Sequence, residues 1–261
     1  MFYKKLKEAR DRNRSFLCVG IDPDPKFISP EDTVSFFRSV IEETSDLVCG
    51  YKPNLPFFEA MGSRGLDALE RILEVVPAEI PIIGDGKRND IPHAARFYAK
   101  SLFDVYKFDA AVVNPYLGFD SVQPFLEWKD KGVFLLCRTS NPGSKDIQDL
   151  RLENGDPLYL AIAKLAQGWS EQGDLGLVVG GTYPEEIEAV RCVCPDMTFL
   201  VPGIGAQGGN LKDVVKYAIK KGVSEKTVTE TFKNVKFLEQ VIKYDRKQPE
   251  FFEDTITYVN K

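Results

Sequence analysis

IPIIGDGKRNDIPHAA, residues 80–95, is the stretch that decides the fold. A short apolar run passes directly into a segment, residues 85–90, in which four of six positions are charged. Charge clusters usually form solvated loops, but this one begins where a buried strand ends. A segment with helical character follows it. The stretch therefore predicts a strand-to-helix unit that carries polar side chains at the carboxyl end of its strand.

The same unit recurs along the chain. Near-continuous apolar runs, rather than alternating ones, are typical of parallel strands that are buried on both faces. Helix signals stand between them: cap, proline and acidic residues at 29–32 and 182–186, and helical spacing of apolar residues at 158–169. The predicted strands are 15–22, 47–54, 80–87, 110–116, 132–140, 175–181 and 198–204.

Polar or glycine-rich residues follow nearly every predicted strand. A barrel gathers all its strand ends around one mouth, where barrel active sites lie. A doubly wound sheet, the alternative, would need such residues mainly at its switch point. We therefore predict an α/β protein with a (β/α)8 TIM barrel. No linker-like or low-complexity tract divides the chain, so residues 1–261 are expected to form one domain.

The eighth strand is not clearly recognisable. A helix-like segment follows Gly209, and no clean apolar run ending in a functional signature comes after it. Residues 235–238 are the nearest candidate, although their context looks more helical than extended.

Composition narrows the class of function. The formal net charge of −5 argues against a nucleic-acid or membrane-surface partner, whose footprint would be basic. No apolar run reaches the roughly 18 residues of a membrane span, and residues 1–15 read as an amphipathic helix rather than a signal peptide. A cytoplasmic location is therefore expected.

Cysteine and histidine usage restricts the chemistry. Of the five cysteines, Cys18, Cys49 and Cys137 lie in apolar runs and are expected to be buried free thiols. The C-x-C pair at 192–194 has no second ligand pair nearby, so zinc is not expected. His93 is the only histidine, which removes multi-histidine metal sites and leaves the chemistry to carboxylates, lysines and backbone groups.

The candidate catalytic residues stand at the predicted mouth. Asp85 and Lys87 are two apart on a strand and so project to one face, where the carboxylate would keep the ammonium protonated as a proton donor. Asp90 can approach from the opening or from a neighbouring subunit. Lys52 and Asp22 end the two preceding strands in the same way. The alternative is a structural ion-pair network that closes the barrel end, and spacing alone favours it.

Two further segments are candidate ligand-binding loops. PGIGAQGG, residues 202–209, can cradle a phosphate with backbone N–H groups and Gln207, or can be a tight structural turn. RTSNPG, residues 138–143, opens a long polar segment in which Ser140 and Asn141 are able to read the edge of a heterocycle. A plain surface turn is the alternative for the second segment.

Taken together, these motifs resemble the orotidine 5′-phosphate decarboxylase family, and within it the bacterial-type subgroup. The resemblance covers residues 15 to about 210 and is specific, because long matched blocks surround the charged motif. The motifs that carry it are GIDPD (20–24), YKPN (51–54), DGKRNDI (85–91), TSNPG (139–143) and PGIGAQGG (202–209).

The resemblance implies a homodimeric barrel that converts orotidine 5′-phosphate to uridine 5′-phosphate and CO2 in pyrimidine synthesis, without metal or organic cofactor. By position, Asp85 would lie near the substrate carboxylate and Lys87 would protonate C6. Lys52 would bind ribose and hold Asp85, and Asp22 would bind a ribose hydroxyl.

The remaining roles follow from the same resemblance. Asp90 and Ile91 would reach the active site of the partner subunit. Ser140 would contact the pyrimidine, and the loop containing Gly205 and Gln207 would bind the phosphate.

Two departures from the family pattern leave alternatives open. Ala94 stands where a threonine is usual, and the expected last strand ending in Ser-Arg is not recognisable. Arg246 stands in a setting that does not fit that pattern and is not assigned a role. The alternatives are a catalytically impaired nucleotide-binding relative, or a related phosphosugar decarboxylase or aldolase.

Overall fold

The computed structural model describes residues 1–203, 217–218, 226–235 and 256–260, the last five as backbone only. Seven parallel strands follow one another around a sheet, and all seven predicted strands are confirmed with somewhat shorter bounds. They are β1 (Leu17–Ile21), β2 (Gly50–Pro53), β3 (Ile83–Arg88), β4 (Ala110–Val113), β5 (Gly132–Arg138), β6 (Asp174–Val179) and β7 (Phe199–Val201).

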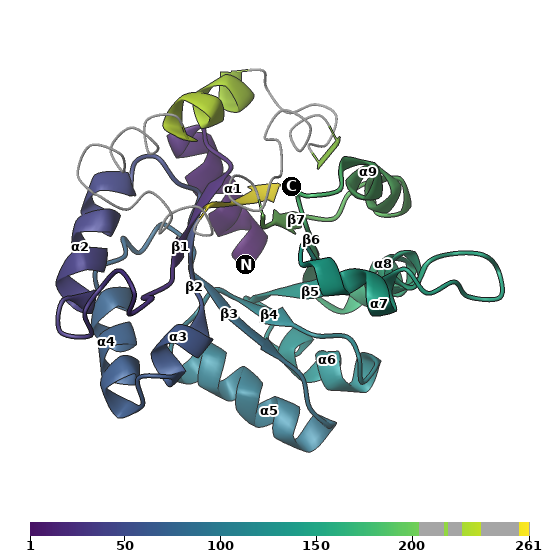
Figure 1. The fold of residues 1–261 in the computed structure, drawn as a ribbon, viewed down its shortest axis with the longest axis horizontal. Coiled ribbons are helices and arrows are strands. Elements are labelled where there is room, and N and C mark those ends of the chain that lie inside the picture. The colour runs from purple at the N-terminus through teal and green to yellow at the C-terminus, as the bar shows by residue number, and fades with distance from the viewer. Residues whose placement is uncertain (204–216, 219–225, 236–255, 261) are drawn as a thin grey trace.

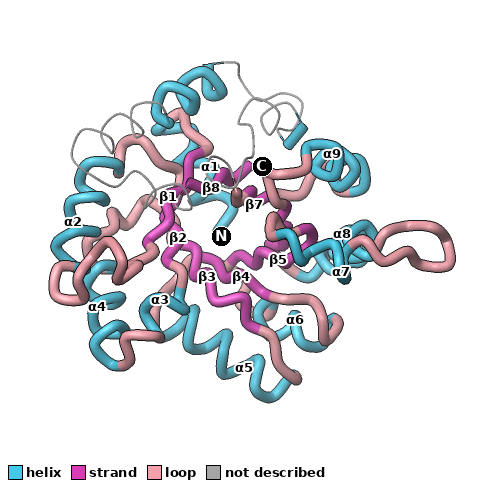
Figure 2. Tube along the Cα trace, in the orientation of Figure 1, coloured by secondary structure: helices cyan, strands magenta, loops and turns pink. Residues whose placement is uncertain are grey.

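The sheet closes on itself. Its order is β2-β1-β8-β7-β6-β5-β4-β3, and the two end strands are joined by bridges from Tyr51 to Ile82 and from Asn54 to Asp85. Figure 2 shows the strands as a ring with the helices outside it, except α1, which lies across the ring in this view. Every residue of β1, β2, β4 and β7 is buried, as expected for strands covered on both faces. The fold is a TIM barrel, and the doubly wound alternative is wrong.

The eighth strand lies far from where the sequence suggested it. β8 (Ile256–Asn260) fits between β1 and β7 and runs antiparallel to both. Of the candidate at 235–238, Val235 is helical, in a segment over 226–235, and residues 236–238 lie outside the described residues. Residues 256–260 are mostly β-branched or aromatic, which favours a strand. Their reversed direction puts Ile256 toward the mouth, beside Val19.

Helices surround the ring (Figure 1). The predicted helix at 158–169 is confirmed in both bounds, and the proline predicted to open a helix at 184 does so. The second helix begins later than its cap signal: the Ser29 hydroxyl accepts a hydrogen bond from the Asp32 N–H in a turn before it. The helices are α1 (Phe2–Asn13), α2 (Thr33–Thr44), α3 (Leu55–Glu59), α4 (Ser63–Leu73), α5 (Pro92–Lys100), α6 (Phe119–Leu126), α7 (Lys145–Gln148), α8 (Leu158–Trp169) and α9 (Pro184–Val193).

The amino-terminal helix closes the base of the barrel. Phe2 and Leu6 of α1 pack into the ring interior with apolar residues from several strands, including Phe134 of β5. A Cβ added at Gly132 would lie 2.2 Å from the Phe2 ring, so the first position of β5 requires glycine. Lys5 adds an ion pair with Asp109 at 2.8 Å. With the base filled, the carboxyl ends of the strands form the open end.

The structure describes all five cysteines, and they are free thiols. Cys18, Cys49 and Cys137 are buried as predicted, whereas Cys192 is exposed. Within the described ranges, no group of three or more histidine, cysteine or acidic side chains is placed to hold a metal ion. None of the described helices is both long and apolar enough to cross a membrane.

Candidate active site

The carboxyl ends of β1, β2 and β3 bring four charged side chains together. Asp85 lies at the centre of the group, with one carboxylate oxygen 3.2 Å from Lys52 Nζ and the other 2.7 Å from Lys87 Nζ. The Lys52 and Asp85 side chains are buried, at 7% and 9% exposure, whereas that of Lys87 is 49% exposed. The predicted pairing of Asp85 with Lys87 is confirmed, and Lys52 completes a Lys–Asp–Lys chain.

Strand β3 is irregular where it carries this chain. Its register with β4 shifts between Gly84 and Arg88, and Lys87 has φ 46°, in the left-handed region. A side chain in that region costs about 1–2 kcal/mol. Such backbone persists where surrounding contacts hold it, and it clusters at functional sites. The Asp85 ion pair is one contact that holds Lys87 there.

Burial and charge act against each other on this chain. Burial alone would raise the pKa of Asp85, but the ammonium groups of Lys52 and Lys87 outweigh it and lower that pKa. Burial would lower the pKa of Lys52, but the carboxylates of Asp85 and Asp22 outweigh it and raise that pKa. Asp85 and Lys52 are therefore both charged at neutral pH.

Asp22 stands beside the chain without a complete set of partners. Burial raises its pKa to about 6, although Lys52 pulls that pKa down. Among the described residues, its buried Oδ1 atom accepts no hydrogen bond, and neither does the buried Oδ1 of Asn54, just after β2. Buried polar atoms are rarely left unpaired. Two such acceptors next to a cation mark a place where a hydroxyl-bearing ligand would complete the hydrogen bonding.

Asp90 and Ile91 lie between β3 and α5, and Asp90 is half-buried. Asp90 accepts a hydrogen bond from the Ile91 backbone N–H at 2.8 Å and, among the described residues, forms no ion pair. The Ile91 side chain is 61% exposed. Ala94 lies on α5, just beyond them.

Ser140 follows β5 on the other side of the mouth, in a half-buried position. The segment after it is not a plain surface turn, since it continues into a 3-10 turn (Pro142–Ser144) and α7. Gly205, Gln207 and Arg246 lie outside the described residues. Sequence reasoning missed Asn54 and the environment of Arg138, although both stand inside motifs that it quoted.

The fold and this charged cluster define a (β/α)8-barrel enzyme whose site lies at the carboxyl ends of its strands. Residues 15–229 match the orotidine 5′-phosphate decarboxylase / HUMPS family. The chain belongs to that family, as its motifs predicted.

Curated relatives agree with this placement. The chain is 47% identical over 231 residues to an orotidine 5′-phosphate decarboxylase from Herpetosiphon aurantiacus, covering 85% of this chain and 86% of the relative. It is 51% identical over 214 residues to the protein of the same name from a Roseiflexus species, covering 79% and 78%. Both relatives are bacterial, as the subgroup resemblance implied.

Solved structures have the same fold. Leishmania donovani UMP synthase superposes with a TM-score of 0.81 at 38% identity over 92% of this chain, which spans 55% of that longer chain. A putative orotidine-monophosphate-decarboxylase from Toxoplasma gondii gives 0.83 at 32% identity, over 94% of this chain and 98% of its own. The family match ends before β8, so the reversed strand lies outside it.

Proposed function

We propose that this enzyme converts orotidine 5′-phosphate to uridine 5′-phosphate and CO2 in pyrimidine biosynthesis, the reaction for which its curated relatives are named. The observation that carries the proposal is the Lys52–Asp85–Lys87 chain at the mouth of a barrel of this family. The chain supplies a fixed cation beside a fixed carboxylate. That is the charge pattern a decarboxylation of an anionic substrate can use.

Lys87 is the proposed proton donor. When the bond between C6 and the carboxylate breaks, the electron pair stays on C6 and CO2 leaves. The Lys87 ammonium then transfers a proton to C6 to form the new C–H bond, and solvent reprotonates the amine. The half-exposed Lys87 side chain suits this role, because it reaches the mouth while Asp85 holds it in place.

Asp85 and Lys52 are proposed to prepare the reaction. A substrate carboxylate bound beside Asp85 would be repelled by it, and that repulsion is relieved when CO2 departs. Lys52 keeps Asp85 ionised and offers a donor to a ribose hydroxyl. The free acceptors of Asp22 and Asn54 fit hydroxyl donors of the same ribose. Ser140 is the proposed pyrimidine contact, and Gly205 and Gln207, outside the described residues, are proposed for the phosphate.

A homodimer is proposed from the surface beside the β3 loop. The loops after β3 and β4 lie together, since the Asn114 N–H donates to the Arg88 carbonyl at 3.0 Å and the Asn89 side chain donates to the Asn114 carbonyl. This surface exposes large apolar side chains, which favours association between copies. They are Ile91 at 61% exposure, Phe97 at 64%, Tyr116 at 84% and Leu117 at 50%.

Mixing two inactive variants tests the shared site. In a dimer where each site uses its own Lys87 and the partner's Asp90, Lys87→Ala and Asp90→Ala are each inactive. After re-pairing, half of the dimers are hybrids with one intact site, so about a quarter of wild-type activity returns. Recovery of no activity, with both variants dimeric by analytical ultracentrifugation, would refute sharing.

The extent of the domain and its location are also proposed. One barrel domain over residues 1–261 is supported by β8, which comes from the far end of the chain and lies between β1 and β7. A cytoplasmic location is supported by the five free cysteines, which suit a reducing compartment.

A second candidate function has one observation in its favour. In the family pattern the eighth strand ends at the mouth in an arginine that grips the phosphate, whereas β8 here runs the other way. The second candidate is therefore a relative that binds the nucleotide but converts it poorly, and this can be tested. The related phosphosugar reactions have no comparable support, since the relatives above are named as orotidine 5′-phosphate decarboxylases.

A direct assay separates the two candidates. Purified, folded protein is mixed with orotidine 5′-phosphate, and the change in its ultraviolet absorbance is followed. Turnover that is abolished in Lys87→Ala supports the decarboxylase. Binding of uridine 5′-phosphate without turnover would support the impaired relative.

A further inference from the structure

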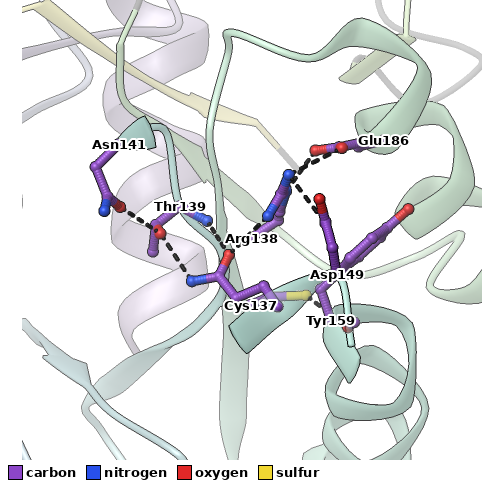
Figure 3. Close-up of polar contacts among 8 residues, drawn as sticks. Cys137, Arg138, Thr139, Asn141, Asp149, Tyr159 and Glu186 are labelled. Carbon is purple, nitrogen blue, oxygen red and sulfur yellow. Dashed lines mark hydrogen bonds and ion pairs between the residues drawn. The ribbon is translucent and has the colours of Figure 1, made fainter. Parts of the chain in front are cut away.

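The carboxyl end of β5 carries a second charged cluster, which the proposed chemistry does not use. Arg138 is fully buried, and its guanidinium donates to both carboxylate oxygens of Glu186 on α9. It also lies 3.2 Å from Asp149, just after α7 (Figure 3). The rings of Tyr159 and Tyr183 lie 5.4 and 5.1 Å from its central carbon. Strand β5, α7, α8 and α9 are thus tied together at one side chain.

Gln148 links this cluster to the segment after β5. Its Oε1 accepts from the Thr139 backbone N–H at 2.9 Å and from Arg138 Nη1 at 3.4 Å. Its Nε2 donates to the Thr139 hydroxyl at 2.8 Å, and that hydroxyl donates to the Asn141 side-chain oxygen at 2.7 Å. Both neighbours of Ser140 are therefore held by one chain of hydrogen bonds, shown in Figure 3.

The end of β6 holds Ser140 from the opposite side. The Gly180 N–H donates to the Arg138 carbonyl at 2.8 Å. A Cβ added at Gly180 would lie 2.8 Å from the Ser140 nitrogen and 2.9 Å from its Cα, closer than real Cβ contacts come. The Ser140 backbone is fixed on two sides, while its hydroxyl has no hydrogen-bond partner among the described residues.

We propose that Gln148, held by the buried Arg138–Glu186–Asp149 cluster, is a positioning residue that orders Ser140 for the base of the nucleotide. The inference rests on the proposed function, since it names what sets the base end of that same site. Arg138 is poorly placed to serve the ligand directly, because its side chain is fully buried and four of its five N–H donors face Glu186, Asp149 and Gln148. What the cluster supplies is order: a segment fixed before binding loses less conformational freedom when the ligand arrives.

Two ligands can show whether Gln148 positions the base contact or supports the whole site. Uridine 5′-phosphate carries the base, and ribose 5-phosphate lacks it. We expect Gln148→Ala to weaken the binding of uridine 5′-phosphate about tenfold, or about 1.4 kcal/mol. The affinity for ribose 5-phosphate should stay unchanged. NMR titration of the full-length chain measures both affinities. Ile147→Ala, an exposed position on the same helix, is the matched control and should change neither.

A double-mutant cycle tests whether Gln148 acts through Ser140. Because the two residues would act in series, Ser140→Ala combined with Gln148→Ala should bind uridine 5′-phosphate no more weakly than Ser140→Ala alone. Gln148→Glu keeps the acceptor for the Thr139 N–H and should recover part of the affinity.

The proposed function and the positioning role of Gln148 would fail in different ways in these measurements. If wild-type protein binds neither ligand, the proposed function fails. If wild-type protein binds uridine 5′-phosphate while Gln148→Ala binds it equally well, the positioning role is overturned. The positioning role would also be overturned if Gln148→Ala lowered the affinity for both ligands equally. Additive losses of affinity in the Ser140→Ala, Gln148→Ala double variant would overturn it as well.

Discussion

Two charged clusters stand at strand ends of the same barrel, and they differ in how completely their polar groups are paired. In the cluster around β3, the Lys87 side chain is half exposed, and one buried oxygen of Asp22, just after β1, has no hydrogen-bond partner within the part of the chain that the structure describes. At β5, the Arg138 guanidinium is fully buried between two carboxylates and two aromatic rings. Spacing alone favours an ion-pair network for the first cluster, and it indicates only a polar loop at Arg138.

The difference gives a physical criterion for telling a reactive cluster from a supporting one. A buried polar atom without a partner costs free energy in the empty protein, so its persistence suggests that a ligand completes it. A network whose buried charges are paired with one another gains little from a ligand and instead holds other groups in place. The four predictions that follow test this contrast.

Removing Lys87 should have the largest effect on catalysis. Lys87→Ala takes away the proposed proton donor, so we expect turnover to fall by at least about 10³-fold. Lys107 is the matched control, because it also has a left-handed backbone, φ 58°, and an ion pair, at 3.0 Å with Asp104. Lys107→Ala should retain full activity in the absorbance assay. Full activity in Lys87→Ala would make the β3 cluster a structural network.

Removing Arg138 should instead act on stability. Arg138→Met leaves Glu186 and Asp149 without their cation, at a cost of about 2–4 kcal/mol in the free energy of unfolding, moderated by their partial exposure. Urea denaturation measures it. Lys87→Ala should lose less stability, since Asp85 keeps Lys52 as a partner. The reverse order of the two losses would contradict the distinction between the clusters.

A substitution that crowds Ser140 should have a smaller effect, limited to the binding of the nucleotide base. Gly180→Ala forces a methyl group against the Ser140 backbone, so we expect affinity for uridine 5′-phosphate to fall up to about tenfold. The control is Gly168→Ala on α8, where an added Cβ meets nothing within 4 Å. Unchanged affinity in Gly180→Ala would show that Ser140 does not need its observed place.

The buried Asp22 carboxyl should make stability depend on pH. Its pKa is about 6 in the fold, against 3.8 ordinarily, so the folded state binds a proton more tightly than the unfolded chain. Stability from this group is full below pH 3.8 and is lost as pH rises to about 6. Asp22→Asn avoids that loss, so its melting temperature relative to wild type should rise by a few degrees between pH 4 and pH 7. A constant difference across that range would contradict the shift.

Much of the barrel could be predicted from local sequence. Seven apolar runs of strand length, each followed by polar residues, were enough for seven strands and for the side of the barrel that carries the site. β8 could not be predicted in the same way. Its five residues have a composition that suits a strand but carry no functional signature, and their place in the barrel depends on pairing with β1 and β7.

The candidate site also has one part that local sequence could predict and one part that it could not. Asp85 and Lys87 could be paired from their spacing, because residues two apart share a face of a strand. Lys52 lies 33 positions from Asp85 in the chain, so their contact depends on β2 and β3 being neighbours in the closed ring. The unpaired oxygens of Asp22 and Asn54 are visible only when burial is known.

The sequence by itself determined the parallel strands, the polar mouth and, through its motifs, the family, because those features are written in short stretches of neighbouring residues. Tertiary structure alone decided the closure by a reversed eighth strand and the unequal pairing of the two charged clusters. The physical reason is that burial and hydrogen-bond saturation depend on groups brought together from distant parts of the chain. Arg138 shows it plainly: its polar motif suggested an open loop, and Glu186, 48 residues away, makes it a buried anchor.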